Sequence, residues 1–456
     1  MFSIFTKGRL FIMLSLSVLG AINTSAQNTV LDGYIHEAFK NNNDIRRQNL
    51  QLEKSLYALK EARSLFLPNI GLLGSYTKAA GGRTIDIPVG DLLNPVYSTL
   101  NQLTETKSFP QLKNTSVLLN PDNFYDAKFR TALPLIDAEI YYNNKIKKAL
   151  ITQQQAAVNV YKRELVKEIK FAYCKYYQAG KAIEIYNSAL VQVNENIRVN
   201  QSMLRNGVRN STSLTRAETE KQKIDASITQ AQNDENNAQS YFNFLLNKPL
   251  ETPIALDTDL FKQQDLIPGE DINVREELTE LKATDLVYNL NTKLQRSYLV
   301  PKLNTFIDLG SQGFNWDVNN KTAYYLWGVN FEWDLFAAGR NQYKIKQAAL
   351  DVQSVEAQYD QSEKTFALQL SQAKNNYNTA VANYNSAKTQ LSLASKYYND
   401  QMKVYKEGQL LYIELLDALN QLTDAQLQLS VSVANVQVAL ADIERCNASY
   451  PLDKNN

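Results

Sequence analysis

Apolar and polar residues alternate strictly in four short stretches of this chain. The clearest stretch is AYYLWGVNFEWDL, from Ala323 to Leu335, in which every second residue is large and apolar. Stretches that begin near Ile70, Tyr125 and Leu303 follow the same pattern. Such alternation predicts strands with one apolar and one wetter face. Each stretch has about ten residues, the length that a tilted strand needs to cross a membrane.

A seven-residue apolar period runs through the longest polar-rich segments. One stripe consists of Ile345, Val352, Tyr359, Phe366, Ala373, Ala380, Ala387 and Ala394, and a second of Leu370, Tyr377, Tyr384, Leu391, Tyr398 and Tyr405. A sustained period of seven predicts helices that supercoil around partner helices. We therefore expect helices near residues 140–206 and 339–406, each roughly 100 Å long, and shorter helices near 30–66 and 271–299 that end before a proline.

The chain also repeats itself. RSLFLPNI, which begins at Arg63, is matched by RSYLVPKL at Arg296, and KIKKA at Lys145 is matched by KIKQA at Lys344. Matches in the same order predict a duplicated unit of helix, two strands, long helix, glycine turn and helix. The predicted divisions are a signal peptide at 1–26, a first repeat at 27–248, a proline-rich linker at 249–270, a second repeat at 271–448 and a tail at 449–456.

The N-terminus predicts export. Lys7 and Arg9 precede an apolar run from Leu10 to Ile22, and NTSAQ then suits signal-peptide removal after Ala26. The run is shorter than the roughly 20 residues that a membrane-spanning helix needs. A soluble exported protein and an outer-membrane β-barrel are both compatible with such a signal.

Composition excludes several classes of function. Lys and Arg number 48 against 47 Asp and Glu, which argues against nucleic acid as a partner. The single histidine, His36, has no nucleophile at a recognisable spacing, so we predict no enzyme, no catalytic residue, no metal site and no cofactor. Cys174 and Cys446 lie far apart in helical stretches, and unpaired packing is favoured over a disulfide.

Four strands cannot close a barrel by themselves, because membrane barrels start at about eight. The predicted fold is therefore mainly α with membrane β, in which several chains share one barrel. Two copies would supply eight strands and three copies twelve. A soluble sandwich is the alternative, although four strands are few for one. The aromatic residues predicted to face the membrane are Tyr76, Phe129, Tyr325, Trp327, Phe331 and Trp333.

At this point the chain resembles the TolC family of outer-membrane channels, also called outer membrane efflux proteins. The segments that carry the resemblance are NNNDI at Asn41, LPNI at Leu67 and YKEGQLLYIELLDALNQLTDAQLQL from Tyr405. The resemblance implies a homotrimer with a 12-stranded β-barrel, four strands per protomer, that continues into a long coiled-coil α-barrel. It also implies the outer membrane of a Gram-negative bacterium, with a periplasmic extension.

The implied function is the exit duct of a tripartite efflux pump that passively conducts drugs and toxic compounds. The implied partners are two further copies, a periplasmic adaptor (membrane fusion) protein, an inner-membrane RND or ABC transporter, and outer-membrane lipid. The same duct could serve type I secretion of proteins or peptides. An exported structural coiled-coil protein is the alternative from another class.

The resemblance also locates a gate. The adaptor-docking tips would be Arg205, Asn206 and Gly207 together with Lys406, Glu407 and Gly408. The periplasmic aperture would carry Glu414 and Asp417, which lie three residues apart on one helix face. Members with a well-described ionic latch have an arginine where this chain has Leu410, and an acidic partner where it has Ser213.

The two predicted hairpins differ in length. The first, from Pro68 to Pro134, is about twice as long as the second, from Pro301 to Asp334. Its extra segment, about 79–128, is rich in turn residues, and we expect it outside the cell or over the barrel mouth. A plug, a partner site and surface protection are all open roles for it.

Overall fold

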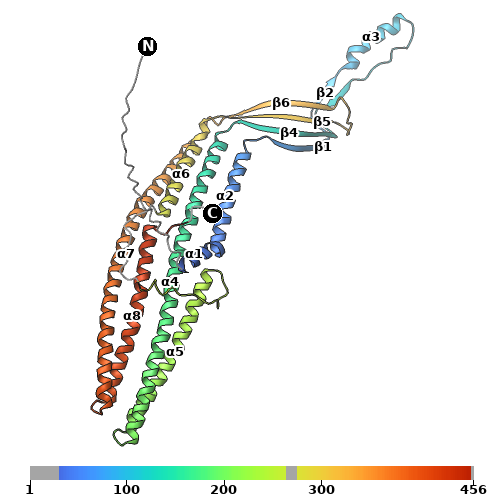
Figure 1. Ribbon diagram of the computed structural model, residues 1–456. Coiled ribbons are helices and arrows are strands. Elements are labelled where there is room, and N and C mark those ends of the chain that lie inside the picture. Colours follow the sequence, from blue (N-terminus) through green and yellow to red (C-terminus); the bar gives the residue numbers. More distant parts are fainter. Residues whose placement is uncertain (1–29, 263–274, 453–456) are drawn as a thin grey trace, which may run out of the picture.

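The computed structural model describes residues 30–262 and 275–452. The predicted signal peptide and part of the predicted linker lie outside these residues. Long helices form a rod, four strands continue from one end of it, and a narrow arm projects beyond the strands (Figure 1). None of the described helices is both long enough and apolar enough to cross a membrane.

Two very long helices run the length of the rod. Helix α4 is Ala138–Arg205, with 68 residues, and α7 is Arg340–Lys406, with 67. In the lower half α4 packs against α5 (Ser211–Leu245) and α7 against α8 (Tyr412–Asn447). In the upper half α2 (Asn43–Ser64) packs on α4, and α6 (Glu276–Arg296) packs on α4 and α7. Helix α6 is followed by a short 3-10 helix, η1 (Ser297–Leu299).

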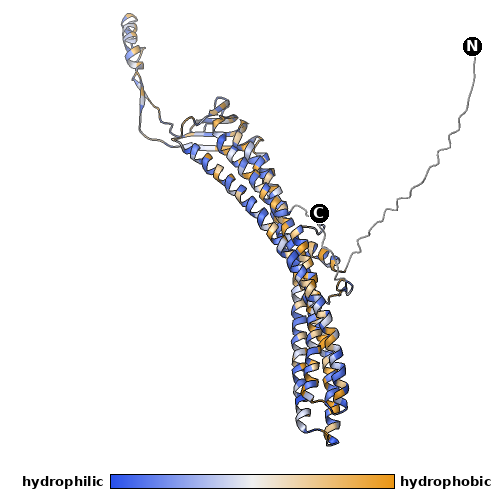
Figure 2. Cartoon of the chain, turned by 90° about the vertical axis from the view of Figure 1, so that its left-hand side faces the viewer, coloured by the Kyte–Doolittle hydropathy of each residue, from blue (hydrophilic) through white to orange (hydrophobic). Residues whose placement is uncertain are grey.

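The seven-residue period is visible in the burial of α7. The buried positions include Ala373, Ala380 and Ala387, and on the neighbouring stripe Tyr377, Tyr398 and Tyr405. Apolar positions lie along the packed sides of the helices, and polar positions cover much of the rest (Figure 2). Near the start of α7 the most buried residues are Ala348 and Val355, so the contact line there is displaced from the predicted Ile345 and Val352.

The prediction of one helix over 30–66 is wrong, because the helix is interrupted at Asn42. Helix α1 (Val30–Asn41) ends there and α2 starts at Asn43. The Oδ1 of Asn42 accepts hydrogen bonds from the N–H groups of Asp44 and Ile45, at 2.9 and 3.1 Å. Asparagine is a preferred N-cap residue because its side chain satisfies these otherwise unpaired donors.

The four predicted strands form one antiparallel sheet in the order β1, β4, β5, β6. Their bounds are Asn69–Thr77, Phe124–Ile136, Lys302–Phe314 and Ala323–Glu332. Leu72, Phe129, Leu309 and Tyr325 pair in one row across all four strands. Each of these four side chains is more than half exposed. One face of the sheet is therefore apolar and lacks any cover from the described residues.

The opposite face of the sheet carries a charged network. Arg130 donates two hydrogen bonds of 2.7 Å to the carboxylate of Asp308. Lys128 and Tyr324 each donate a hydrogen bond of 2.7 Å to Asp126. Bidentate pairing of this kind fixes side-chain orientation as well as charge. The predicted separation of an apolar face from a polar face is confirmed.

The fourth strand is shorter than predicted. It ends at Glu332, which pairs with Lys302, the first residue of β5. Pro301 precedes Lys302 and has no N–H group to extend the ladder. Trp333 and Leu335 therefore lie beyond the strand, although the alternation continues through them.

The long first hairpin contains regular structure that the sequence analysis missed. Strands β2 (Thr84–Ile87) and β3 (Thr115–Leu118) pair with each other, and helix α3 (Val89–Leu103) lies between them. The projecting arm in Figure 1 consists of these three elements. The arm leaves the main sheet at the paired residues Thr77 and Phe124.

The largest buried apolar cluster lies near the middle of the rod. It joins α1, α4, the end of α5, α8 and the described part of the linker through Ile35, Tyr173, Phe242, Phe261 and Ala434. Residues 251–259 contain no helix or strand. Cys174, which belongs to this cluster, and Cys446 are both unpaired, as the sequence favoured.

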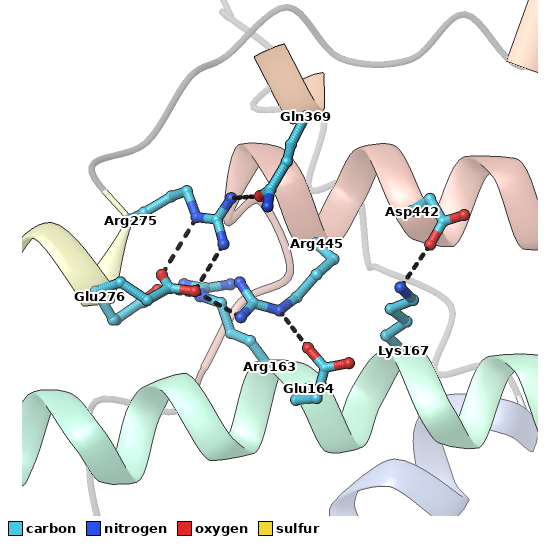
Figure 3. A network of polar contacts seen from close by, with 9 residues as sticks. Arg163, Glu164, Lys167, Arg275, Glu276, Gln369, Asp442 and Arg445 are labelled. Atoms are coloured by element: carbon cyan, nitrogen blue, oxygen red, sulfur yellow. Dashed lines mark hydrogen bonds and ion pairs between the residues drawn. The ribbon is translucent and has the colours of Figure 1, made fainter. Parts of the chain in front are cut away.

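Beside this cluster, three arginines tie four helices together. We call Arg163, Arg275 and Arg445, with Glu164, Glu276 and Glu277, the equatorial arginine cluster. Figure 3 shows the arginines converging from α4, from the residue that precedes α6 and from α8. Arg445 donates 2.6 and 3.0 Å hydrogen bonds to Glu277 and Glu164. Arg275 reaches α7 through Gln369, at 2.9 Å. The cluster therefore fixes the position of α6, the first described element after residue 262.

Charge at Glu277 stabilises this junction. Burial by itself would raise the pKa of Glu277, but hydrogen bonds from Arg275 and Arg445 outweigh burial and lower it to about 2. Because the folded-state pKa lies below the ordinary value of 4.5, the stabilisation is complete above about pH 4.5. It is lost as the pH falls through about 2. The shift corresponds to roughly 3 kcal/mol at neutral pH.

We expect Glu277→Gln to lower the free energy of unfolding at pH 7 by about 3–5 kcal/mol, because it removes the anion that two largely buried guanidinium groups share. Among the described residues, Arg445 would keep Glu164, whereas Arg275 would keep only the neutral Gln369. Chemical unfolding of detergent-solubilised protein, followed by circular dichroism, measures this loss. Near pH 2 the difference between the variant and the natural protein should shrink. The matched control is Glu363→Gln on the exposed side of α7, for which we expect a change within about 0.5 kcal/mol. Equal losses in the two variants would contradict this role of Glu277.

Candidate functional site at the helical turns

Two glycine turns lie side by side at the end of the rod farthest from the strands (Figure 1). Gly207 and Gly408 have φ values of +69° and +77°. In the first turn, Gly207 N–H bonds to Leu204 C=O at 3.1 Å and Val208 N–H bonds to Met203 C=O at 2.9 Å. The second turn repeats both bonds from Gly408 and Gln409. Each turn is thus a Schellman motif, whose left-handed position favours glycine.

The turns rest on a small aromatic and aliphatic core. Tyr405, Leu415 and Ala418 are completely buried, and Tyr412 is nearly so. The Tyr405 hydroxyl donates a hydrogen bond to Asn200 Oδ1, which links α7 to α4. Burial raises the pKa of Tyr405, so this phenol keeps its proton at physiological pH. The core therefore holds the two hairpins together directly above the turns.

Arg209 links the two turns across almost two hundred residues of sequence. Its Nη2 donates a 3.1 Å hydrogen bond to the Gly408 carbonyl and another to the Leu410 carbonyl. Its guanidinium also lies over the Tyr405 ring, 5.7 Å from the centroid. Arg209 follows the first turn glycine by two residues, whereas the sequence analysis looked for an arginine two residues after the second. The sequence analysis therefore missed it.

The two predicted aperture acids lie in the first two turns of α8, and both are exposed. Glu414 Oε2 accepts a hydrogen bond from the Leu411 N–H at 3.1 Å, which is half of a capping box. Asp417 accepts a hydrogen bond from Gln421 at 2.7 Å. Glu414 thus helps to start the helix as well as placing a negative charge beside the turn.

Among the described residues, the other predicted tip residues form no ion pair with these two acids. Leu410 is partly buried against the tip core and offers its carbonyl to Arg209. Ser213 is partly buried in the first turn of α5. The remaining predicted docking side chains are exposed: Arg205, Asn206, Lys406 and Glu407. The aperture and docking roles of all these residues stay predictions.

The predicted membrane-facing aromatics are also exposed. Tyr76, Phe129, Tyr325, Trp327 and Phe331 lie on the apolar face of the sheet, as its register requires. Trp316, which the sequence analysis did not select, stacks on Tyr76 and Tyr125 with centroid distances of 5.4 and 5.2 Å. Its position in a turn with positive φ hid this role, because no alternation marks it.

No group of three or more His, Cys, Asp or Glu in residues 30–262 and 275–452 is placed to hold a metal ion.

Comparison with known proteins gives one family match. Residues 275–446, which contain α6 to α8 and strands β5 and β6, match the family described as outer membrane efflux protein. The matched segment covers less than half of the 456-residue chain and is similar to the outer membrane efflux proteins. The resemblance inferred from the sequence is thereby confirmed. A search of curated protein sequences found no match.

Solved structures of outer-membrane channels share the fold of this chain. The channel OprN is 16% identical, with a TM-score of 0.73 over 92% of this chain and 90% of its own. CmeC of Campylobacter jejuni is 14% identical, with a TM-score of 0.72 over 92% and 85%. MtrE of Neisseria gonorrhoeae, solved in an open state, is 15% identical, with a TM-score of 0.70 over 91% and 88%. At these identities the likeness shows a common, mainly helical fold.

We expect Arg209→Ala to loosen the second turn, because the Gly408 and Leu410 carbonyls lose a charged donor. Loss of such a hydrogen bond costs about 1–3 kcal/mol. Hydrogen exchange at residues 404–412 should speed up roughly tenfold or more. Arg216→Ala, at an exposed position of α5, is the control and should leave that exchange unchanged. Unaltered exchange in Arg209→Ala would show that the hydrogen bonds from Arg209 do not stabilise the second turn.

Proposed function

We propose that this chain is the exit duct of a tripartite efflux pump in the outer membrane of a Gram-negative bacterium. Three copies would build one duct, through which small toxic compounds pass without chemical change. A periplasmic adaptor and an inner-membrane RND or ABC transporter would complete the pump and supply its energy. The observation that carries the proposal is a sheet with an uncovered apolar face, joined directly to helical hairpins roughly 100 Å long.

The sheet supports assembly through its edges. β1 and β6 are the outer strands of the four-stranded sheet, and each pairs with only one neighbour among the described strands. An unpaired edge is costly in hydrocarbon, because its N–H and C=O groups have no water to bind. Pairing β1 of one copy with β6 of the next removes every edge once the ring closes, and three copies give twelve strands.

The two faces of the sheet support its orientation. The exposed row of Leu72, Phe129, Leu309 and Tyr325 suits contact with lipid. The face with Arg130 and Asp308 suits a water-filled interior, because its charged groups would be costly in lipid and the Arg130 side chain is exposed there. The predicted membrane-facing aromatics of the four strands lie on the lipid side in this arrangement.

The exposed turns support a role in docking and gating. In a trimer, Glu414 and Asp417 would bring six carboxylates to the narrow end of the duct. Close carboxylates attract cations and repel anions. The exposed residues of both turns, Arg205, Asn206, Lys406 and Glu407, would meet the adaptor.

The proposal predicts ion channels in a planar lipid bilayer. Purified protein should give discrete conductance steps that favour cations. In Glu414→Gln/Asp417→Asn, the ratio of cation to anion permeability should fall by roughly two- to fivefold, because the aperture loses its negative charge. Glutamine is chosen because it can still close the capping box with the Leu411 N–H.

The matched control is Asp360→Asn/Glu363→Gln, which removes two exposed acids at the same spacing in the half of α7 nearer the strands. Its selectivity should stay closer to that of the natural protein. Equal selectivity in both variants would reject the two aperture acids and leave the duct intact. A folded trimer without conductance steps would reject the duct itself.

A further inference from the structure

The arm formed by β2, α3 and β3 has an apolar face that no other described element covers. In Figures 1 and 2 α3 stands clear of the other helices, beyond the strand ends. Its exposed apolar residues are Leu92, Leu93, Val96 and Leu103, with exposed fractions of 68, 37, 51 and 76%. A continuous apolar face of this kind marks an interaction site.

The other side of α3 is held by paired hydrogen bonds. Asn94 exchanges two bonds with the backbone of Leu112, at 2.7 and 2.9 Å. Asn101, seven residues later, exchanges two with the backbone of Phe109, at 2.8 and 3.0 Å. A Cβ atom at Gly90 would collide with the Leu112 carbonyl, so glycine permits this close approach. These bonds fix which way α3 faces, and the apolar face consequently points outward.

The spacing of the apolar face fits another helix. Val89, Leu92, Val96 and Leu103 are separated by three, four and seven residues, the pattern of a helix that packs along a partner helix. Lipid is a poorer fit, because helices that lie on membrane surfaces carry Lys or Arg on their polar face. Asp91 is the one charged residue of α3, and α3 has no basic residue.

We propose that the partner of this face is the α3 of another copy of the chain. The inference rests on the trimer of the proposed function. The arm leaves the sheet at Thr77 and Phe124, at the ends of β1 and β4. Those ends would ring the mouth of a closed barrel, so three arms would stand around one axis. Because α3 has a single charge, hydrogen-bonded to Asn114, little repulsion opposes their contact. The three α3 helices then pack together over the mouth.

Single cysteines on α3 test this packing. Val96→Cys and Leu103→Cys should form disulfide-linked dimers when the detergent-solubilised trimer is treated with copper phenanthroline. Gln102→Cys, next to Leu103 but on the polar side, is the matched control and should form several-fold fewer. The parent protein, which has free thiols at Cys174 and Cys446, gives the background. That background should be low because burial raises the pKa of both thiols.

A second measurement uses no cysteine. Leu92→Ser/Val96→Ser/Leu103→Ser should lower the temperature at which the trimer dissociates on a native gel, and Gln102→Ser should not. A trimer that shows equal cross-linking at positions 102 and 103, or unchanged dissociation, overturns the arm packing and leaves the duct standing. A protein that is monomeric by light scattering in detergent overturns both proposals.

Discussion

Small side chains along the contact between long helices are the constraint on which the rest of the structure depends. Ala373, Ala380 and Ala387 recur at seven-residue spacing and are buried, and the first two pack in one cluster with residues of α8. This repeat keeps the same side of α7 turned toward its partner over many turns. A curved rod of paired helices results, and it separates the strands from the glycine turns by most of its length (Figure 1).

The middle of the rod and its turn end are stabilised by different interactions. Near the strands and at mid-height, charge pairs such as Arg445 with Glu277 fix the order of the helices. At the turns, a buried tyrosine core and one arginine perform that task. Buried ion pairs define geometry well but contribute little net stability compared with apolar packing. The middle of the rod therefore combines the largest apolar cluster with ion pairs that fix the order of its helices, and the turns combine a smaller tyrosine core with the links from Arg209.

Local pattern was sufficient to predict the strands, their two faces and the long helices, because apolar residues recur every second residue in the strands and every seventh in the helices. Features that depend on contact with a distant segment of the chain could not be predicted from local pattern. The end of β6 depends on Pro301, which directly precedes the neighbouring strand β5. The contact of Arg209 with Gly408 joins two segments that sequence separation hides. Helix α3 was missed because Gly81, Gly82, Pro88 and Pro95 suggested only turns. Its apolar spacing was nevertheless readable.

The asymmetry between the two turns has a mechanical consequence. The turns share one backbone geometry, yet only the first supplies an arginine that binds the carbonyls of the second. One hairpin cannot slide past the other without breaking those bonds and disturbing the tyrosine core beneath them. Three such chains would have six helical hairpins, but the two hairpins of each chain would move together, so the assembly would have only three independently moving units. Opening at the turns would then require each pair of hairpins to rotate as a whole, because the Arg209 hydrogen bonds hold its two members together.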